Sequence, residues 1–152
     1  MPVTVGERAP DFELYDQDAN PVSRASLEGR KSLIVFIPLP FSGICEAELC
    51  SIRDNLDRLN DMDANVVVIT CDTRFVHKKW AAEQGFEFPL LSDFWPHGET
   101  ARAYGSFNED RGVANRMTYV LDDTGLVQEV IDSGSLGVAR EMDAYLEALG
   151  KT

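Results

Sequence analysis

The chain has 152 residues, of which 44% are hydrophobic, so residues 1–152 are expected to form one domain with a buried core. Its formal charge of −12 argues against nucleic acid or an anionic membrane surface as a partner, because like charges repel at long range. Three cysteines, an odd number in a chain too long to depend on disulfides, favour a reducing compartment, and we expect a cytoplasmic protein.

The first quarter of the chain predicts a hairpin followed by a buried strand. Apolar and polar residues alternate around Phe12 and Leu14, and turn-forming residues 16–21 interrupt the pattern, which is typical of a short hairpin that caps a sheet. Residues 32–38, SLIVFIP, form a continuous apolar run, as in a strand buried on both faces, and Pro38 ends its hydrogen bonding. The longest apolar run, residues 33–41, is far shorter than the roughly 20 residues that cross a bilayer, so neither a signal peptide nor a transmembrane span is expected.

Helical and strand patterns then alternate to the end of the chain. From Cys45 onward, Leu49, Ile52, Leu56 and Leu59 recur at helical spacing and predict a helix of about four turns. The later elements are a strand at 65–71, a helix at 75–85, a strand at 88–93, a short helix at 100–107, a hairpin at 117–131 that turns at Asp123, Thr124 and Gly125, and a helix at 138–150. This alternation indicates an α/β fold with a central sheet flanked by helices.

Cys45 lies where the first buried strand gives way to a helix. At about 100° per residue, the apolar residues of this helix fall within roughly 40° of Cys45, which therefore faces the core in the first helical turn. Unpaired backbone N–H groups and the positive end of the helix dipole favour a thiolate there, so a reactive cysteine is preferred over a structural one. Ser42, three residues earlier, is either a hydrogen-bond donor to this turn or an ordinary turn residue.

The other two cysteines have different surroundings. Cys50 lies at about 140° on the same helix, off the apolar stripe, and is equally compatible with packing and with redox chemistry. Five residues of helix rise about 7.5 Å, more than the roughly 7 Å between Cα atoms that a disulfide spans, so a bond to Cys45 requires the first turns to unwind. Cys71 ends a buried strand and is expected to be a core residue.

Several segments together resemble the peroxiredoxins. Pro38, Ser42 and Cys45 are spaced as in the active-site signature of that family, with Ser in the place usually held by Thr. Four further segments, APDFEL, PLLSDFWPHGE, YGSFNED and ANRMTYVLDDTG, are similar to the alkyl hydroperoxide reductase E group of one-cysteine peroxiredoxins, and the resemblance covers nearly the whole chain. Cys50, in contrast, resembles the resolving cysteine of the bacterioferritin comigratory, or Q-type, peroxiredoxins.

The resemblance implies a thioredoxin-like fold and a thiol-dependent peroxidase for hydrogen peroxide and organic hydroperoxides, without a cofactor. It makes Cys45 the peroxidatic cysteine, Ser42 and Arg116 its partners, and Pro38 the lid over the site. Fixed donors and a cation lower the barrier when a thiolate attacks a peroxide, which agrees with these roles. Without the resemblance, Arg116 would be read as a surface arginine paired with one of many acids.

The role of Glu48, the resolving thiol and the identity of the reductant each have two alternatives. Glu48 either orients Arg116 or complements the helix dipole as an ordinary first-turn glutamate. We favour a Cys45–Cys50 disulfide that a thioredoxin-type or mycothiol-linked (mycoredoxin-type) system reduces, although an external thiol is the alternative resolving partner.

Two other functions are compatible with a reactive cysteine at this position. A non-catalytic redox sensor would use the same Cys45, whereas a thioredoxin-like disulfide reductase is disfavoured because the chain contains no C-x-x-C. His77 and His97 lack metal-ligand spacing, so we expect no metal site and treat both as packing or surface residues. Trp80 and Trp95 are expected in the core or an interface, and residues 94–98, FWPHG, suggest a homodimer.

Overall fold

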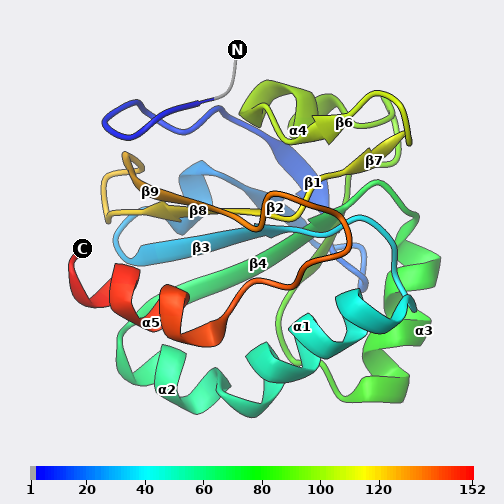
Figure 1. The fold of residues 1–152 in the computed structure, drawn as a ribbon, viewed down its shortest axis with the longest axis horizontal. Coiled ribbons are helices and arrows are strands. Elements are labelled where there is room, and N and C mark those ends of the chain that lie inside the picture. Colours follow the sequence, from blue (N-terminus) through cyan, green and yellow to red (C-terminus); the bar gives the residue numbers. More distant parts are fainter. Residues whose placement is uncertain (1–2) are drawn as a thin grey trace.

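The structure, a computed structural model, describes residues 3–152 and has a mixed sheet at its centre (Figure 1). Five strands make up this sheet, in the spatial order β5 (Leu90–Ser92), β4 (Ala64–Thr70), β3 (Lys31–Phe36), β8 (Met117–Leu121) and β9 (Val127–Asp132). Neighbouring strands are parallel from β3 to β5 and antiparallel from β3 to β9. The expected central mixed sheet is therefore confirmed.

Two layers cover the faces of the sheet (Figure 1). The helices below it in the view are α1 (Gly43–Asp54), α2 (Leu56–Asp61), α3 (Arg74–Gln84) and α5 (Met142–Gly150). The opposite face carries the N-terminal hairpin of β1 (Glu13–Tyr15) and β2 (Pro21–Ser23), the 3-10 helix η1 (Ala25–Leu27), α4 (Glu99–Tyr104) and the small hairpin of β6 (Phe107–Asn108) and β7 (Val113–Ala114). The predicted N-terminal hairpin is thus present.

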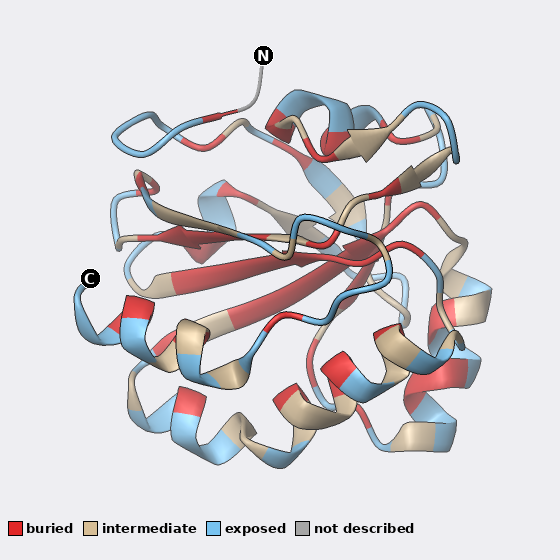
Figure 2. Ribbon diagram, in the orientation of Figure 1, coloured by how far each residue is buried: buried red, intermediate tan, exposed pale blue. Residues whose placement is uncertain are grey.

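The apolar run of β3 contributes to a hydrophobic core on each face, because successive side chains of a strand point to opposite sides. Leu33 and Val35 pack with the helices α1, α2, α3 and α5, whereas Ile34 and Phe36 pack with the N-terminal segment and α4. All four side chains are fully buried, and Figure 2 shows the middle of the sheet as the most continuously buried part of the ribbon. Burial on both faces explains why this strand lacks polar alternation.

Three predicted helices differ from the observed ones. The short helix predicted at 100–107 ends at Tyr104, because Gly105 takes a left-handed φ of 81° and Phe107 belongs to β6. The helix predicted to run without interruption from Cys45 through Leu59 breaks at Asn55, whose side-chain amide donates to the Ser51 carbonyl at 2.8 Å and whose φ of −112° is not helical. Such side-chain bonding to the backbone competes with helical hydrogen bonding. The last helix begins at Met142 instead of residue 138, because the Arg140 N–H donates to the Glu48 carboxylate at 2.8 Å instead of to a carbonyl of a helical turn.

None of the helices within residues 3–152 combines the length and the apolar character that a membrane crossing requires.

Candidate active site

The turn between β3 and α1 places Cys45 in the first helical turn. Pro38 has no backbone N–H and follows the last residues of β3, and Phe41 then takes a left-handed φ of 69°, which reverses the chain into the helix. Ser42 is the N-cap residue of α1, and the Glu46 N–H donates to its carbonyl at 2.8 Å. Cys45 is fully buried, so its sulfur lies against the core while the positive end of the helix dipole stabilises negative charge there.

Glu48, one turn after Cys45, holds two buried arginines. Its Oε1 accepts from Arg116 Nη1 at 2.6 Å and from Arg140 Nη2 at 3.0 Å. Its Oε2 accepts from the Arg140 backbone N–H at 2.8 Å and from Arg140 Nε at 2.9 Å. Since the three side chains are almost completely inaccessible to solvent and carry two positive charges against one negative, the cluster retains one net positive charge next to the first turn of α1. Of the two roles considered for Glu48, positioning Arg116 is the one that this geometry supports.

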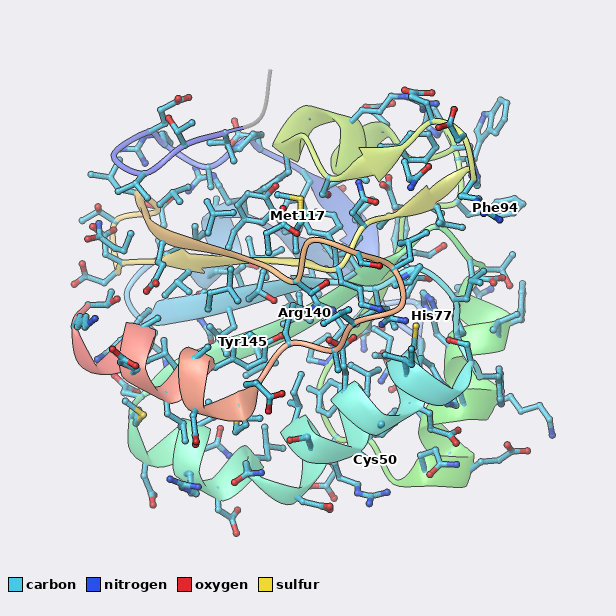
Figure 3. All side chains as sticks on the ribbon, viewed as in Figure 1. Cys50, His77, Phe94, Met117, Arg140 and Tyr145 are labelled. Carbon is cyan, nitrogen blue, oxygen red and sulfur yellow. The ribbon has the colours of Figure 1, made fainter. Side chains whose placement is uncertain are left out.

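Arg140 also connects the cluster to the last helix. Its Nη1 donates to Thr118 Oγ1 at 3.1 Å, and Thr118 Oγ1 shares a 2.9 Å hydrogen bond with the Tyr145 hydroxyl. Figure 3 shows Arg140 and Tyr145 near each other, where the loop before α5 passes over the sheet. The position of Arg140 is therefore set by β8, α1 and α5 together.

Burial and the neighbouring charges act in opposite directions on the pKa values of Glu48 and Arg140. Burial alone would raise the pKa of Glu48, but the hydrogen bonds and charge of Arg140, with the charge of Arg116, hold it below the ordinary glutamate value. Burial would likewise lower the pKa of Arg140, but Tyr145, Glu48 and Cys45 together raise it. Glu48 and Arg140 thus stay ionised.

A cavity of about 490 Å³ opens beside the first turn of α1. Its lining consists of Pro38, Leu39, Ser42, Gly43, Ile44, Arg111, Val113, Arg116 and Leu136. Three of the residues predicted for the site, Pro38, Ser42 and Arg116, thus meet around one space. Arg116 is held there from both sides, by Glu48 and by the Leu136 carbonyl, which accepts from Arg116 Nε at 2.6 Å.

Of the two expectations for Ser42, its hydrogen bond agrees with an ordinary turn residue. Its hydroxyl donates to the Leu39 carbonyl at 2.8 Å and not to the helical turn. Within residues 3–152, neither Ser42 nor Arg116 is hydrogen-bonded to Cys45 Sγ. The hydroxyl oxygen of Ser42 keeps its lone pairs free to accept a hydrogen bond from a molecule in the cavity.

All three cysteines are free. Cys50 is half-buried on the same unbroken helix as Cys45, and its Sγ contacts Gln84 Oε1 at 3.7 Å (Figure 3). Cys71 is buried, and burial together with the charge of Asp93 raises the pKa of its thiol to about 12, which agrees with a core residue.

The two histidines and two tryptophans divide between core and surface. His77 is fully buried and shares a hydrogen bond with Thr70, and His97 bonds to the Gly112 carbonyl. Trp80 is fully buried, whereas Trp95 is 82% exposed. Across residues 3–152, three or more His, Cys, Asp or Glu side chains nowhere gather in a group able to hold a metal ion.

Arg140 is the residue of the site that the sequence analysis did not find. Residues 138–150 follow a helical pattern, which suggests that Arg140 lies on an exposed helical face, and no motif in the sequence marks it as buried. A buried guanidinium requires a carboxylate partner, and that partner, Glu48, is 92 residues away in the chain.

Comparisons of the chain with known proteins agree with one another. Residues 5–130 match the AhpC/TSA family. The chain is 43% identical to alkyl hydroperoxide reductase E of Mycobacterium tuberculosis over 148 residues, 97% of this chain and 96% of that protein. It is similar to the crystal structure of Enterococcus faecalis AhpC, with 26% identity, a TM-score of 0.89 and coverage of 99% of this chain and 92% of that one.

A second structural likeness is to peroxidoxin BcpB from Mycobacterium tuberculosis, with 29% identity, a TM-score of 0.85 and coverage of 97% of this chain and 96% of that one. The segment that matches the family contains Pro38, Ser42, Cys45 and Arg116, whereas Arg140 lies beyond its end.

Proposed function

Because the chain belongs to the AhpC/TSA family and is a thiol-dependent peroxidase with a thioredoxin-like fold, we propose that Cys45 is the thiol that attacks the peroxide. One observation carries this assignment: Cys45 is buried in the first turn of α1, whose residues Gly43 and Ile44 line the cavity that contains Arg116, and Glu48 of the net positive cluster lies three residues further along the same helix. Cys71, in contrast, is a buried thiol whose pKa is raised to about 12, which makes it a poor nucleophile.

The reaction proceeds in three steps. The Cys45 thiolate attacks the distal oxygen of the hydroperoxide, an S–O bond forms as the O–O bond breaks, and the departing alkoxide or hydroxide takes a proton to become an alcohol or water. Cys45 is then a sulfenic acid, oxidised by two electrons. A second thiol attacks its sulfur, which forms a disulfide and releases water, and an external reductant returns both thiols.

Arg116 supplies the fixed charge for the first step. Negative charge develops on the departing oxygen, and a cation held in place before the reaction stabilises that charge without reorganisation. Ser42, whose hydrogen is engaged by the Leu39 carbonyl, accepts the hydrogen of the reacting O–H and so orients the peroxide. Pro38, buried just after β3, lines the cavity and is the proposed lid over Cys45.

Glu48 and Arg140 act through Arg116. Glu48 sets the position of the Arg116 guanidinium with its 2.6 Å hydrogen bond, and Arg140 keeps Glu48 in place with three hydrogen bonds. Both are positioning residues in this assignment.

Cys50 is the proposed resolving thiol, within the single domain that residues 1–152 are proposed to form. Its half-buried position on α1 leaves it closer to solvent than Cys71, and it precedes the helix break at Asn55, where α1 ends. A Cys45–Cys50 disulfide requires α1 to unwind, because the helix is continuous between the two residues. The disulfide would then be open to a thioredoxin-type or mycothiol-linked reductant.

The protein is further proposed to be a cytoplasmic homodimer. An odd number of cysteines in a chain too long to depend on disulfides supports a reducing compartment. Phe94 and Trp95 are 48% and 82% exposed, and large exposed aromatic side chains are typical of protein interfaces. Light scattering at micromolar concentration should give the mass of a dimer for the wild type, and Trp95→Ser should shift the mass towards a monomer; a monomeric wild type would contradict this assignment.

Intact mass under non-reducing conditions, after one equivalent of hydrogen peroxide, tests the cysteine roles. The wild type should lose two hydrogens, and Cys50→Ser should gain one oxygen at Cys45. Cys71→Ser is the matched control and should behave as the wild type. A wild type that gains one oxygen and keeps it until a thiol is added would show that Cys50 is not the resolving residue.

The same variants separate an enzyme from a redox sensor. With a reductant present, the wild type should consume many equivalents of peroxide, whereas Cys45→Ser should consume none. If Cys45→Ser keeps its peroxidase activity, the assignment of Cys45 is wrong.

A further inference from the structure

The cavity at the active site is much larger than hydrogen peroxide requires. A water molecule occupies about 30 Å³ in the liquid, so a peroxide of two oxygen atoms would fill only a small part of a cavity of about 490 Å³. Cavities of roughly 300–1,000 Å³ are typical of sites for organic ligands. Leu39, Ile44, Val113 and Leu136 give this one predominantly apolar walls, which suit a hydrocarbon chain.

Arg111 adds a second cation to the lining of this cavity. It lies in the turn between β6 and β7, where its backbone N–H donates to Asn108 Oδ1 at 3.0 Å. The register between these two strands, with Asn108 opposite Val113, fixes the base of the turn. Arg111 is thus presented at the cavity by a hairpin that has its own backbone hydrogen bonds.

The two arginines of the cavity differ in how their charges are satisfied. Arg116 is buried and bonded to Glu48 and to the Leu136 carbonyl. The Arg111 side chain is exposed and, within residues 3–152, forms neither an ion pair nor a side-chain hydrogen bond. Its neighbour Asp110 is exposed and makes no ion pair with it, and none of the residues that line the cavity is acidic. Arg111 is therefore free to bind an anion from the cavity.

The geometry points to Arg111 as a specificity-determining residue that selects organic hydroperoxides carrying a carboxylate. This inference rests on the proposed function of Cys45. The hydroperoxide group lies at Ser42 and Arg116, the carbon chain lies along the apolar walls, and the carboxylate forms an ion pair with Arg111. The net charge of −12 opposes the approach of any anion, but this repulsion is screened beyond about 8 Å at physiological salt, so the local positive charge decides binding within the cavity.

The expected effect of Arg111 is modest, because its guanidinium is exposed. Exposed ion pairs typically change an equilibrium by up to about fivefold. Arg111→Gln should therefore lower the second-order rate constant for oxidation of Cys45 by a medium-chain hydroperoxy fatty acid about three- to fivefold. Arg111→Glu, which replaces attraction by repulsion, should lower it further. The methyl ester of the same hydroperoxide and hydrogen peroxide should react with unchanged rate constants in both variants.

The experiment is stopped-flow measurement of Cys45 oxidation with three probes: the hydroperoxy fatty acid below its micelle concentration, its methyl ester, and hydrogen peroxide. Arg58→Gln is the matched control, because it removes the same charge from an exposed arginine on α2, which is not part of the cavity lining. The ratio of acid to ester rate constants should fall in Arg111→Gln, stay at the wild-type value in Arg58→Gln, and decrease with added salt in the wild type.

Two results would overturn the inference. An acid-to-ester ratio that is the same in Arg111→Gln and the wild type would show that the carboxylate does not meet Arg111. An equal loss for all three probes would show that Arg111 acts on the reaction at Cys45 instead of on substrate choice. Failure of the proposed function has a different signature, since Cys45 of the wild type would then react with none of the three.

Discussion

Replacing Glu48 by Gln should strongly destabilise the folded protein. The Glu48 carboxylate accepts four hydrogen bonds, three from Arg140 and one from Arg116, with distances of 2.6 to 3.0 Å. The amide oxygen of Gln can accept two of them at most, and its NH₂ group would face a guanidinium that can only donate. Two buried positive charges would be left without a counter-charge.

The size of this loss in stability follows from the burial of the three side chains. The side chains of Glu48, Arg116 and Arg140 are 2%, 3% and 0% exposed, so water cannot compensate for the lost carboxylate. Removing one partner of a buried ion pair typically lowers the free energy of unfolding by about 3–5 kcal/mol. That is a large share of the roughly 5–15 kcal/mol by which a domain is stable, so the midpoint of urea unfolding should fall markedly.

Urea unfolding at pH 7, followed by circular dichroism, measures this loss. Glu147→Gln is the control, because it breaks the ion pair with Lys151, in which both side chains are about 70% exposed, and should leave stability nearly unchanged. The wild type should also lose stability as the pH falls below 4.5, the ordinary pKa of glutamate, since the pKa of Glu48 is lower in the folded state and its contribution is present only above this range. A loss of less than about 1 kcal/mol in Glu48→Gln would refute the description of this cluster.

Three further predictions concern groups outside the cavity. Burial lowers the pKa of His77 to about 4, so its neutral form contributes about 3 kcal/mol to the free energy of unfolding above pH 6.5, and this contribution is lost as the pH falls to 4. The free energy of unfolding of His77→Gln should therefore change less with pH between 6.5 and 4, by the slope that corresponds to about one proton. Burial keeps the Cys71 thiol protonated, so mass spectrometry should find it unmodified after brief treatment of the native protein with iodoacetamide at pH 8. Tyr145→Phe should lower the free energy of unfolding by about 1 kcal/mol, measured in urea, and should largely keep the rate of Cys45 oxidation, because Arg140 retains its bonds to Glu48.

The sequence predicts those parts of the fold that depend on local pattern. An unbroken apolar run such as residues 32–38 can only be satisfied by burial on both faces, so β3 and its place in the centre of the sheet follow directly. The position of Cys45 at the start of a helix follows from Pro38, Ser42 and Gly43 before it and the apolar stripe after it. Cys45 is therefore marked by local pattern alone, whereas the roles of Ser42 and Arg116 come from the resemblance to the peroxiredoxins.

Features that depend on distant partners are not predictable in this way. Leu56 and Leu59 continue the apolar stripe of α1, so periodicity cannot detect the break at Asn55, which depends on one side-chain hydrogen bond to Ser51. Arg140 fits a helical pattern equally well, and only its bonds to Glu48 from another part of the chain keep residues 138–141 out of the helix. The cluster of Glu48, Arg116 and Arg140 is thus formed by residues far apart in the chain, and local sequence pattern does not predict it.

The place of Glu48 in the chain links this cluster to the fate of oxidised Cys45. Glu48 lies between Cys45 and Cys50 on α1, so unwinding the helix enough to join the two sulfurs would pull its carboxylate away from Arg116 and Arg140. The buried charges that position Arg116 for attack on the peroxide therefore also oppose the opening that the disulfide needs. Since leaving such buried charges unpaired typically costs about 3–5 kcal/mol, the opening should slow disulfide formation. In a time course of intact mass, the wild type should gain one oxygen before it loses two hydrogens.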